Sequence, residues 1–258
     1  MSEAVILTSE KGHIGYITLN RPEAYNTFNP EFATLLNDAL EAFDADENIR
    51  VVVINNSGKH FSTGIDLHEF GSKPNNDYDE FIALMDKHNH TIINMRKPVI
   101  SSVKGYCVAN GAGLSFASDM TVAAESSKFG TTAITVGLIC TGPGIPLLAN
   151  VGRKKAMEMV LLGEILTATQ AQELGLVNWV VADDELEAKT DEIAMKIVEK
   201  SPLAIAAGKL GLSKAADVRY SDSIDFGSKK FASLCSSEDA KEGVAAFLGK
   251  RKPTWQLK

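Results

Sequence analysis

The sequence predicts an α/β protein whose last part is wholly helical. Two observations support this fold class. Between residues 5 and 181, short runs rich in β-branched residues alternate with longer segments of helical periodicity. From Asp184 onward, only helical segments follow one another. We therefore expect an α/β core over residues 1–195 and a helical region over residues 196–258.

The chain is expected to begin with a β-hairpin and a helix. Residues 5–8 and 14–19 are rich in strand-forming side chains, and Gly12 lies in the turn between them. Asn29 and Pro30 are well suited to the N-cap and first position of a helix. Behind them, apolar side chains recur at helical spacing: Phe32, Leu35, Leu36, Leu40 and Phe43.

Further strands and helices follow in alternation. A continuous apolar run predicts a strand buried on both faces at 51–54, and further strands are expected at 99–103, 120–123 and 177–181. Helical segments are expected at 81–95, 152–162, 169–174, 185–199, 202–215, 220–235 and 238–248.

Composition narrows the class of function. Apolar residues make up 45% and charged residues 23% of the chain, as in soluble globular proteins. The formal net charge is -7, and the basic residues are scattered rather than clustered. A nucleic-acid or membrane-surface binder needs a basic patch, so we expect neither partner. A small anionic ligand is compatible with the negative net charge, because a few cations and backbone N–H groups can hold it.

Cysteine use and the N-terminal sequence indicate a reducing compartment. Cys107, Cys140 and Cys235 are far apart, odd in number and without metal-site spacing. The first residues lack a charged segment followed by an apolar one, as a signal peptide would have. No apolar run approaches the roughly 18 residues of a membrane span. We expect a cytoplasmic protein without a metal ion.

Two glycine-containing segments are the candidates for chemistry. Residues 58–67 and 105–114 each follow a predicted buried strand. Backbone N–H groups at such turns lack intrahelical partners and attract negative charge. Two of them converging on one oxygen would form an oxyanion hole. Close backbone packing is the alternative explanation of the glycines, and either segment alone leaves it open. Asp66 is expected to cap a short helix.

Five segments, in order, carry motifs of a known family. They read NRPEAYN at 20–26, FSTGIDL at 61–67, KPVI at 97–100 followed by GY at 105–106, ATQAQELGLV at 168–177, and EDAKEGVAAFLGKRKP at 238–253. Together they resemble the motifs of the crotonase (enoyl-CoA hydratase/isomerase) superfamily, and the resemblance covers nearly the whole chain.

The resemblance implies a fold, an assembly and a substrate class. Its fold is a spiral of ββα units followed by C-terminal helices that form a homotrimer, often a dimer of trimers. Its substrate is an acyl-CoA thioester, with no cofactor beyond coenzyme A itself. By position, the backbone N–H groups of Ile65 and Asn110 would be the oxyanion donors. Such donors accelerate a reaction because they bind the enolate more tightly than the ground-state carbonyl.

The resemblance also identifies two departures. Hydratases of the family use two glutamates for acid–base chemistry, and their positions correspond here to Gly113 and Ala133. His68 and Cys140 are the remaining candidates for a reactive side chain near the acyl group. The resemblance places the acyl-CoA close to the following residues: Ala24, Asn26, Ser62, Gly64, Ile65, Asn110, Gly113 and Ala133.

Three hypotheses of function follow. The first is a hydratase/isomerase-like enzyme that stabilises a thioester enolate without the glutamate pair. The second is an acyl-CoA decarboxylase or a thioester hydrolase; decarboxylation suits such a site because loss of CO2 forms the enolate without a base. The third is a non-catalytic acyl-CoA binder, which the emptied positions Gly113 and Ala133 favour.

Overall fold

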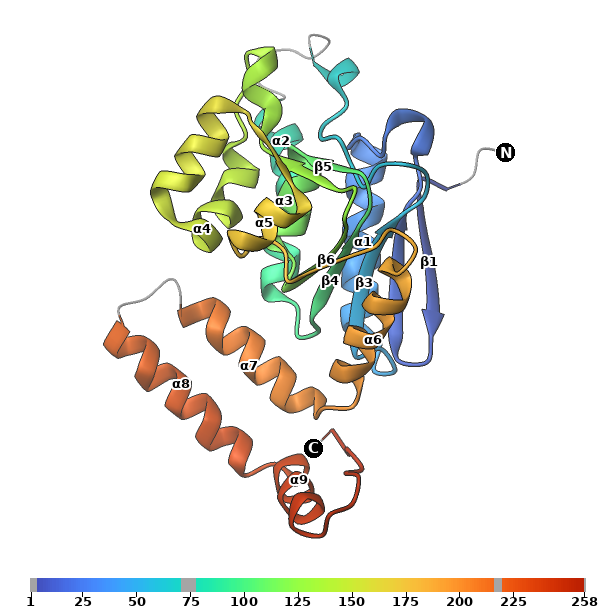
Figure 1. The fold of residues 1–258 in the computed structure, drawn as a ribbon. Coiled ribbons are helices and arrows are strands. Elements are labelled where there is room, and N and C mark those ends of the chain that lie inside the picture. The colour runs from blue at the N-terminus through green and yellow to red at the C-terminus, as the bar shows by residue number, and fades with distance from the viewer. Residues whose placement is uncertain (1–3, 71–77, 216–219, 258) are drawn as a thin grey trace.

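The computed structural model describes residues 4–70, 78–215 and 220–257. Its centre is a six-stranded sheet with the strand order β1-β2-β3-β4-β6-β9 (Figure 1). β1 and β2 are antiparallel and all other neighbours are parallel. The strands are β1 (Ile6–Lys11), β2 (Ile14–Leu19), β3 (Val51–Asn56), β4 (Val99–Val103), β6 (Met120–Ala124) and β9 (Trp179–Val181). The predicted hairpin and buried strands are confirmed.

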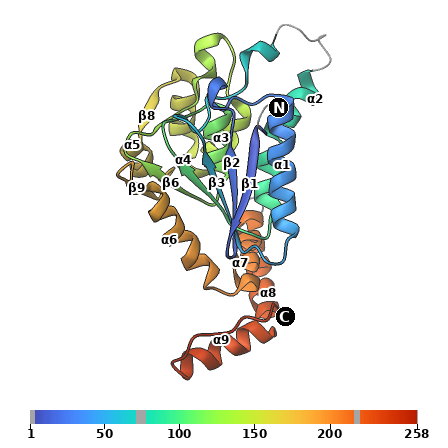
Figure 2. The same ribbon diagram turned by 90° about the vertical axis from the view of Figure 1, so that its right-hand side faces the viewer.

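The two faces of this sheet are covered by different helices. Alternate side chains of β3 point to opposite faces, as in any strand. Val51 and Val53 pack in one cluster with α6 (Leu186–Val198), whereas Val52 and Ile54 pack in a larger cluster with α1 (Pro30–Ala45). Figure 2 shows α1 and α6 on opposite sides of the strands. Burial on both faces explains why β3 is continuously apolar.

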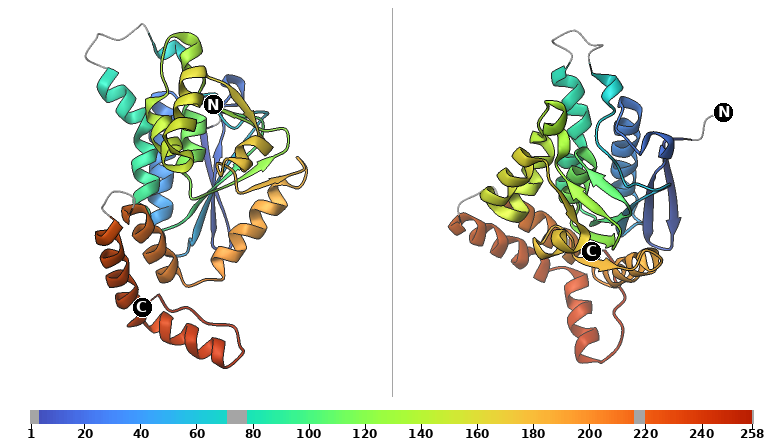
Figure 3. Two further views of the ribbon diagram at one scale, coloured as in Figure 1. Left: turned by 60° about the vertical axis from the view of Figure 1, so that its left-hand side comes forward. Right: turned by 45° about the horizontal axis from the view of Figure 1, so that its top comes forward.

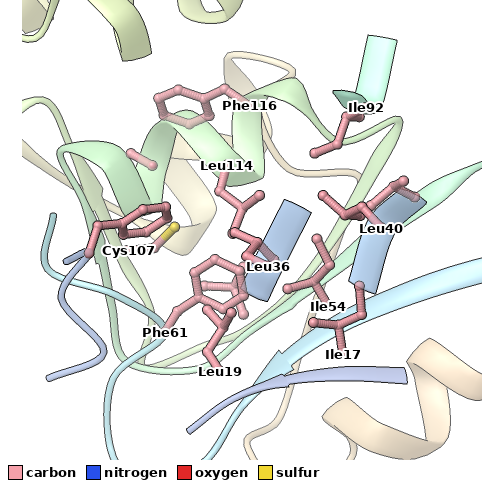
Figure 4. Close-up of a cluster of buried hydrophobic side chains, with 14 of the residues drawn as sticks. Ile17, Leu19, Leu36, Leu40, Ile54, Phe61, Ile92, Cys107, Leu114 and Phe116 are labelled. Atoms are coloured by element: carbon pink, nitrogen blue, oxygen red, sulfur yellow. The ribbon is translucent and has the colours of Figure 1, made fainter. Parts of the chain in front are cut away.

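Local sequence fixes where α1 begins. The Asn29 side chain accepts a hydrogen bond from the Phe32 N–H at 2.8 Å, and Pro30 is the first helical residue. This confirms the predicted N-cap, a contribution of about 1 kcal/mol to stability. The buried face of the helix then contributes Leu36 and Leu40 to the core (Figure 4).

The larger core cluster joins the strands to the glycine-rich segments. Phe61, Cys107 and Leu114 are fully buried and lie together with Leu19 and Leu36 (Figure 4). Burying a Leu or Phe side chain stabilises a fold by roughly 1.5–3 kcal/mol. These contacts therefore anchor both segments that were singled out as candidates for chemistry.

A second, three-stranded sheet was not predicted. Its order is β5-β7-β8, with β5 (Tyr106–Val108), β7 (Lys128–Gly130) and β8 (Ile165–Thr167). The chain passes from β4 in the first sheet to β5 in the second and then into α3 (Asn110–Ala117). The chain passes from the first sheet to the second again between β6 and β7. This strand–strand–helix succession agrees with the ββα units that the resemblance implied, and it places the α3 N-terminus at an end of the second sheet.

The helices otherwise follow the sequence prediction, with one correction. The predicted helix at 152–162 is only the second half of α4 (Thr141–Leu162), which is interrupted at Gly152 by a φ of 74°. Its first half contains Gly142, Pro143 and Pro146, residues of low helix propensity that hid it in the sequence. The remaining helices of the α/β part are α2 (Tyr78–Asn94) and α5 (Ala168–Glu173).

The C-terminal part consists of helices, as predicted. α7 (Pro202–Ala215), α8 (Tyr220–Cys235) and α9 (Glu238–Leu248) lie beside and beyond one end of the α/β body (Figures 1 and 3). They leave large apolar side chains exposed at Leu212, Phe231, Val244, Phe247 and Leu248. Because α6 continues to Val198, the domain division at 195/196 falls in its last turn and stays a prediction. Among the described residues, no helix is both long and apolar enough to cross a bilayer.

Candidate functional site

The two glycine-containing segments lie side by side. The Ser62 N–H donates to the Tyr106 carbonyl at 3.1 Å, and the Val108 N–H donates to the Ser62 carbonyl at 3.0 Å. Gly64 has a φ of 104°, and a β-carbon there would lie 2.7 Å from the β-carbon of Ala109 and 3.6 Å from the Asn110 nitrogen. A side chain at position 64 would therefore separate the segments, so glycine is required for this approach.

Ile65 and Asn110 present their backbone N–H groups without acceptors. Phe28 pairs with the carbonyl of Gly64 at 2.8 Å and with the N–H of Asp66 at 2.9 Å, and it leaves the Ile65 N–H unused. Asn110 is the first residue of α3, whose opening N–H groups have no intrahelical partner. Neither N–H has an acceptor among the described residues. Both residues line one cavity.

This cavity has a volume of about 560 Å³ and a largely apolar wall. The size is typical of a pocket for a small molecule. Its wall comes from both glycine-containing segments, from α2, from the stretch between β7 and α4, and from the first turn of α4. The larger apolar lining residues are Ile65, Leu67, Phe70, Ile82, Ile134, Val136, Leu138 and Ile139. Both residues with free N–H groups thus border a space that is mainly apolar.

Asp86 is the only carboxylate among the described residues that line the cavity. It lies on α2, where it is half-buried, and its Oδ1 accepts a hydrogen bond from Asn110 Nδ2 at 3.0 Å. Burial raises the pKa of this carboxyl group, while the Asn110 hydrogen bond and the nearby His90 ring oppose the rise. Sequence reasoning missed Asp86. The available signal was its position four residues after Ile82, on the same face of the helix.

His68 points away from the cavity. Its side chain is 98% exposed, and its Nδ1 lies 2.8 Å from Asp66 Oδ1. Asp66 also accepts from the His68 N–H and pairs with Arg21 at 2.8 Å, so its predicted capping role is confirmed. Burial alone would raise the pKa of Asp66, but the hydrogen bonds from His68 and Arg21 outweigh it and lower that pKa. The contacts among Arg21, Asp66 and His68 thus fix the backbone directly after Ile65.

Cys140 does line the cavity. Its side chain is buried, and burial raises the pKa of its thiol. A thiol is a weak nucleophile, because the thiolate is the reactive form. The structure therefore places Cys140 in the cavity wall but gives it no activating neighbour among the described residues.

The residues before Ile65 build the segment rather than the cavity wall. Asn26 is fully buried; its side chain accepts from the Arg21 N–H at 2.6 Å and donates to the His60 carbonyl at 2.8 Å. Ser62 is also buried, and its Oγ accepts from the Gly64 N–H at 3.3 Å. Ala24 lies in a short 3-10 helix over Pro22–Ala24. None of these is among the described lining residues.

Gly113 and Ala133 differ in their access to the cavity. Ala133 lines it. Gly113 is buried within α3, where a β-carbon would lie 3.1 Å from Pro143 Cγ and 3.2 Å from Pro143 Cα. Any side chain at position 113 would thus require Pro143 to move. Neither residue supplies a group that can transfer a proton.

Comparisons with known proteins agree with this geometry. A sequence model described as enoyl-CoA hydratase/isomerase matches residues 9–258. The chain is 36% identical to a probable enoyl-CoA hydratase of Rhizobium meliloti over 254 residues, 98% of each chain. It is 34% identical to the 2,3-dehydroadipyl-CoA hydratase of Escherichia coli, over 99% of each chain. A solved enoyl-CoA hydratase of Mycobacterium smegmatis superposes with a TM-score of 0.95 at 35% identity, covering 98% of this chain and 99% of that one. The chain therefore belongs to the crotonase superfamily, as an enzyme of the enoyl-CoA hydratase/isomerase family.

Proposed function

We propose that this enzyme binds an acyl-CoA thioester and stabilises its enolate between the backbone N–H groups of Ile65 and Asn110. One observation carries the proposal: both N–H groups lack acceptors among the described residues, and both residues line the same apolar cavity. A thioester oxygen placed between them would gain two hydrogen bonds that strengthen as negative charge develops. The acyl chain would then occupy the apolar wall beyond.

The reaction class that fits best is proton transfer at the α-carbon of an enoyl- or acyl-CoA, as in hydration or isomerisation. Gly113 and Ala133 stand where the family resemblance places the two catalytic glutamates, so the proposal includes loss of that pair. Decarboxylase and hydrolase activities are alternatives within the same site. Asp86 in the cavity disfavours a decarboxylase, because a substrate carboxylate would face a like charge there.

The test of the proposal is a carbonyl-frequency measurement. Butyryl-CoA labelled with 13C at the thioester carbonyl is titrated into the enzyme and followed by infrared difference spectroscopy. We expect saturable binding and a shift of the carbonyl band to lower frequency, because two donors polarise the bond. Absence of binding by butyryl-, crotonyl- and malonyl-CoA alike would refute the proposal.

A matched pair of variants isolates one donor. Asn110→Pro removes the N–H at the first position of α3, where proline is well tolerated in helices. Asn110→Ala keeps the N–H and removes only the side chain. We expect the proline variant to lose most of the carbonyl shift and the alanine variant to retain it. An equal shift in both would contradict the assignment of Asn110 as a donor.

Turnover of a substrate panel separates the remaining hypotheses. Crotonyl-, 3-hydroxybutyryl-, β,γ-enoyl- and malonyl-type thioesters are incubated with the enzyme, and the products are identified by mass spectrometry. Hydration or isomerisation supports the proposed class, and release of CO2 or of free acid supports the alternatives. Tight binding with no product from any substrate would favour a non-catalytic binder. A homotrimeric or hexameric assembly and a cytoplasmic location remain predictions.

A further inference from the structure

We propose that Asp86 is the catalytic group that moves the proton at the substrate α-carbon, in place of the two absent glutamates. This inference rests on the proposed function, since it assumes that a thioester oxygen sits at Ile65 and Asn110. Asp86 lies outside all the segments that carry the family motifs, on α2.

The position of Asp86 supports this role. A proton-transfer group must lie in the substrate cavity, within reach of the carbon next to the thioester. Asp86 lines the same cavity as Ile65 and Asn110, and its side chain touches the Asn110 side chain at 3.0 Å. Among the described lining residues it is the only carboxylate, and Cys140 is the only other titratable group.

The contacts around Asp86 leave one oxygen available. Oδ1 is held by the Asn110 amide, which fixes the orientation of the carboxyl group. Oδ2 lies so close to Gly142 that a β-carbon there would collide with it. The glycine therefore makes room for this oxygen, which has no hydrogen-bond donor among the described residues. Burial raises the pKa of the group, which brings it nearer to the neutral range where general bases work best.

The proposed step is abstraction of the α-proton by Asp86. The ionised Oδ2 takes a proton from the α-carbon; the C–H bond breaks, an O–H bond forms, and the electron pair enters the enolate. The negative charge develops on the thioester oxygen, which Ile65 and Asn110 face. The same Oδ2 then returns a proton to the α-carbon or, in isomerisation, to the γ-carbon. In hydration, Oδ2 takes a proton from water, the resulting hydroxide bonds to the β-carbon of the enoyl group, and Oδ2 then delivers the proton to the α-carbon.

Exchange of the α-protons with solvent tests this step without depending on the overall reaction. Butyryl-CoA, which has no double bond to hydrate, is incubated with enzyme in D2O at saturating concentration, and deuterium uptake is followed by mass spectrometry. We expect uptake with the wild type. Asp86→Asn should slow it by about 100-fold or more, because general acid–base catalysis contributes 10²–10⁴-fold. The asparagine keeps an oxygen that can accept from Asn110, so the local packing is preserved.

The control is Asp79→Asn, an equal charge change on the exposed face of the same helix, which should leave exchange unchanged. The carbonyl shift of bound butyryl-CoA is measured for every variant. A wild type that neither binds nor shifts the band would refute the proposed function. A wild type that binds but shows no exchange, or an Asp86→Asn variant that exchanges at the wild-type rate, would overturn only the role of Asp86. If Asp86→Asn lost both binding and exchange, Asp86 would be a binding residue, and its catalytic role would equally be overturned.

Chemical rescue distinguishes proton transfer from positioning of Asn110. Asp86→Ala removes the carboxylate and leaves space beside Gly142. If Asp86 transfers the proton, added formate should restore at least 10-fold of the lost exchange rate in this variant, and it should have no effect on the wild type. If Asp86 only orients Asn110, formate would restore nothing, and the catalytic assignment would be wrong.

Discussion

Lys209 of α7 donates to Asp119 Oδ2 at 2.7 Å and to the Lys97 carbonyl at 2.9 Å. Its side chain is only 5% exposed, although it joins a C-terminal helix to the end of the sheet. Asp119 also accepts from the Val99 N–H at 2.8 Å, at the start of β4. Burial lowers the pKa of Lys209, and the Asp119 charge opposes this. The pair is therefore a polar connection between α7 and the α/β body.

Replacing this lysine should loosen α7. Lys209→Met keeps the length of the side chain but leaves Asp119 without its cation. Breaking a buried pair costs about 3–5 kcal/mol, and partial exposure of Asp119 places the expected loss at or below the lower end. Chemical denaturation measures this loss, and limited proteolysis should release a C-terminal fragment sooner than in the wild type. The control is Lys241→Met, whose exposed pair with Glu238 should contribute under about 0.5 kcal/mol. Equal effects would contradict the connecting role of Lys209.

Gly64→Ala should damage the site more than the fold. The new methyl group would lie 2.7 Å from the Ala109 β-carbon and push the Asn110 N–H away from Ile65. Loss of one oxyanion donor typically lowers turnover by 10²–10³-fold. Gly12→Ala is the matched control, because Gly12 also has a positive φ but nothing lies within 4 Å of its β-carbon position. Both should lose about 1–2 kcal/mol of stability from backbone strain, and only Gly64→Ala should lose activity.

Acid should destabilise the protein through His88. This ring is buried against Phe28, with 5.5 Å between ring centroids, and burial lowers the pKa of His88 to about 4. Protonation therefore favours the unfolded chain, whose histidine has an ordinary pKa near 6.5. The contribution of neutral His88 to the free energy of unfolding is fully present above pH 6.5. It falls by about 3 kcal/mol as the pH drops toward 4. His88→Phe should flatten the stability–pH curve in this window, measured by urea unfolding. An unchanged slope in His88→Phe would contradict this prediction.

The exposed apolar face of α7, α8 and α9 predicts self-association. Phe247 is 83% exposed, and Leu212 and Leu248 are nearly as open. Phe247 and Leu248 are neighbours in the chain, and large apolar side chains this exposed are typical of a surface that another protein covers. Phe247→Asp should shift the protein from a trimer or hexamer toward a monomer in sedimentation velocity experiments. A wild type that stays monomeric at micromolar concentration would refute the predicted assembly.

The fold was predictable wherever local sequence decides it. Asn29 and Pro30 mark the start of α1, and apolar periodicity marks its length. The strands β5, β7 and β8 were not predictable, because each has three residues and no alternating pattern. Their pairing depends on contacts between distant segments, such as Phe129 with Leu166. α4 was half missed because Gly142, Pro143 and Pro146 disfavour a helix that tertiary packing nevertheless stabilises.

The candidate site was likewise predictable only where a sequence motif marks it. Ile65 and Asn110 lie within the two glycine-containing segments, and the structure brings both to one cavity. Asp86 has no motif around it, and its proximity to Asn110 arises from the packing of α2 against α3 across 24 residues of sequence. His68 was a reasonable candidate by sequence distance, but the Asp66 cap turns its side chain toward solvent.

The contact between Gly113 and Pro143 has a consequence for changing this enzyme's chemistry. A glutamate introduced at position 113 would begin with a β-carbon 3.1 Å from the proline ring, so the single substitution would strain α3 against α4 before it could act on a substrate. Replacing Pro143 first would open the space. The two positions are therefore coupled, and a glutamate at position 113 should cost less stability once Pro143 has been replaced.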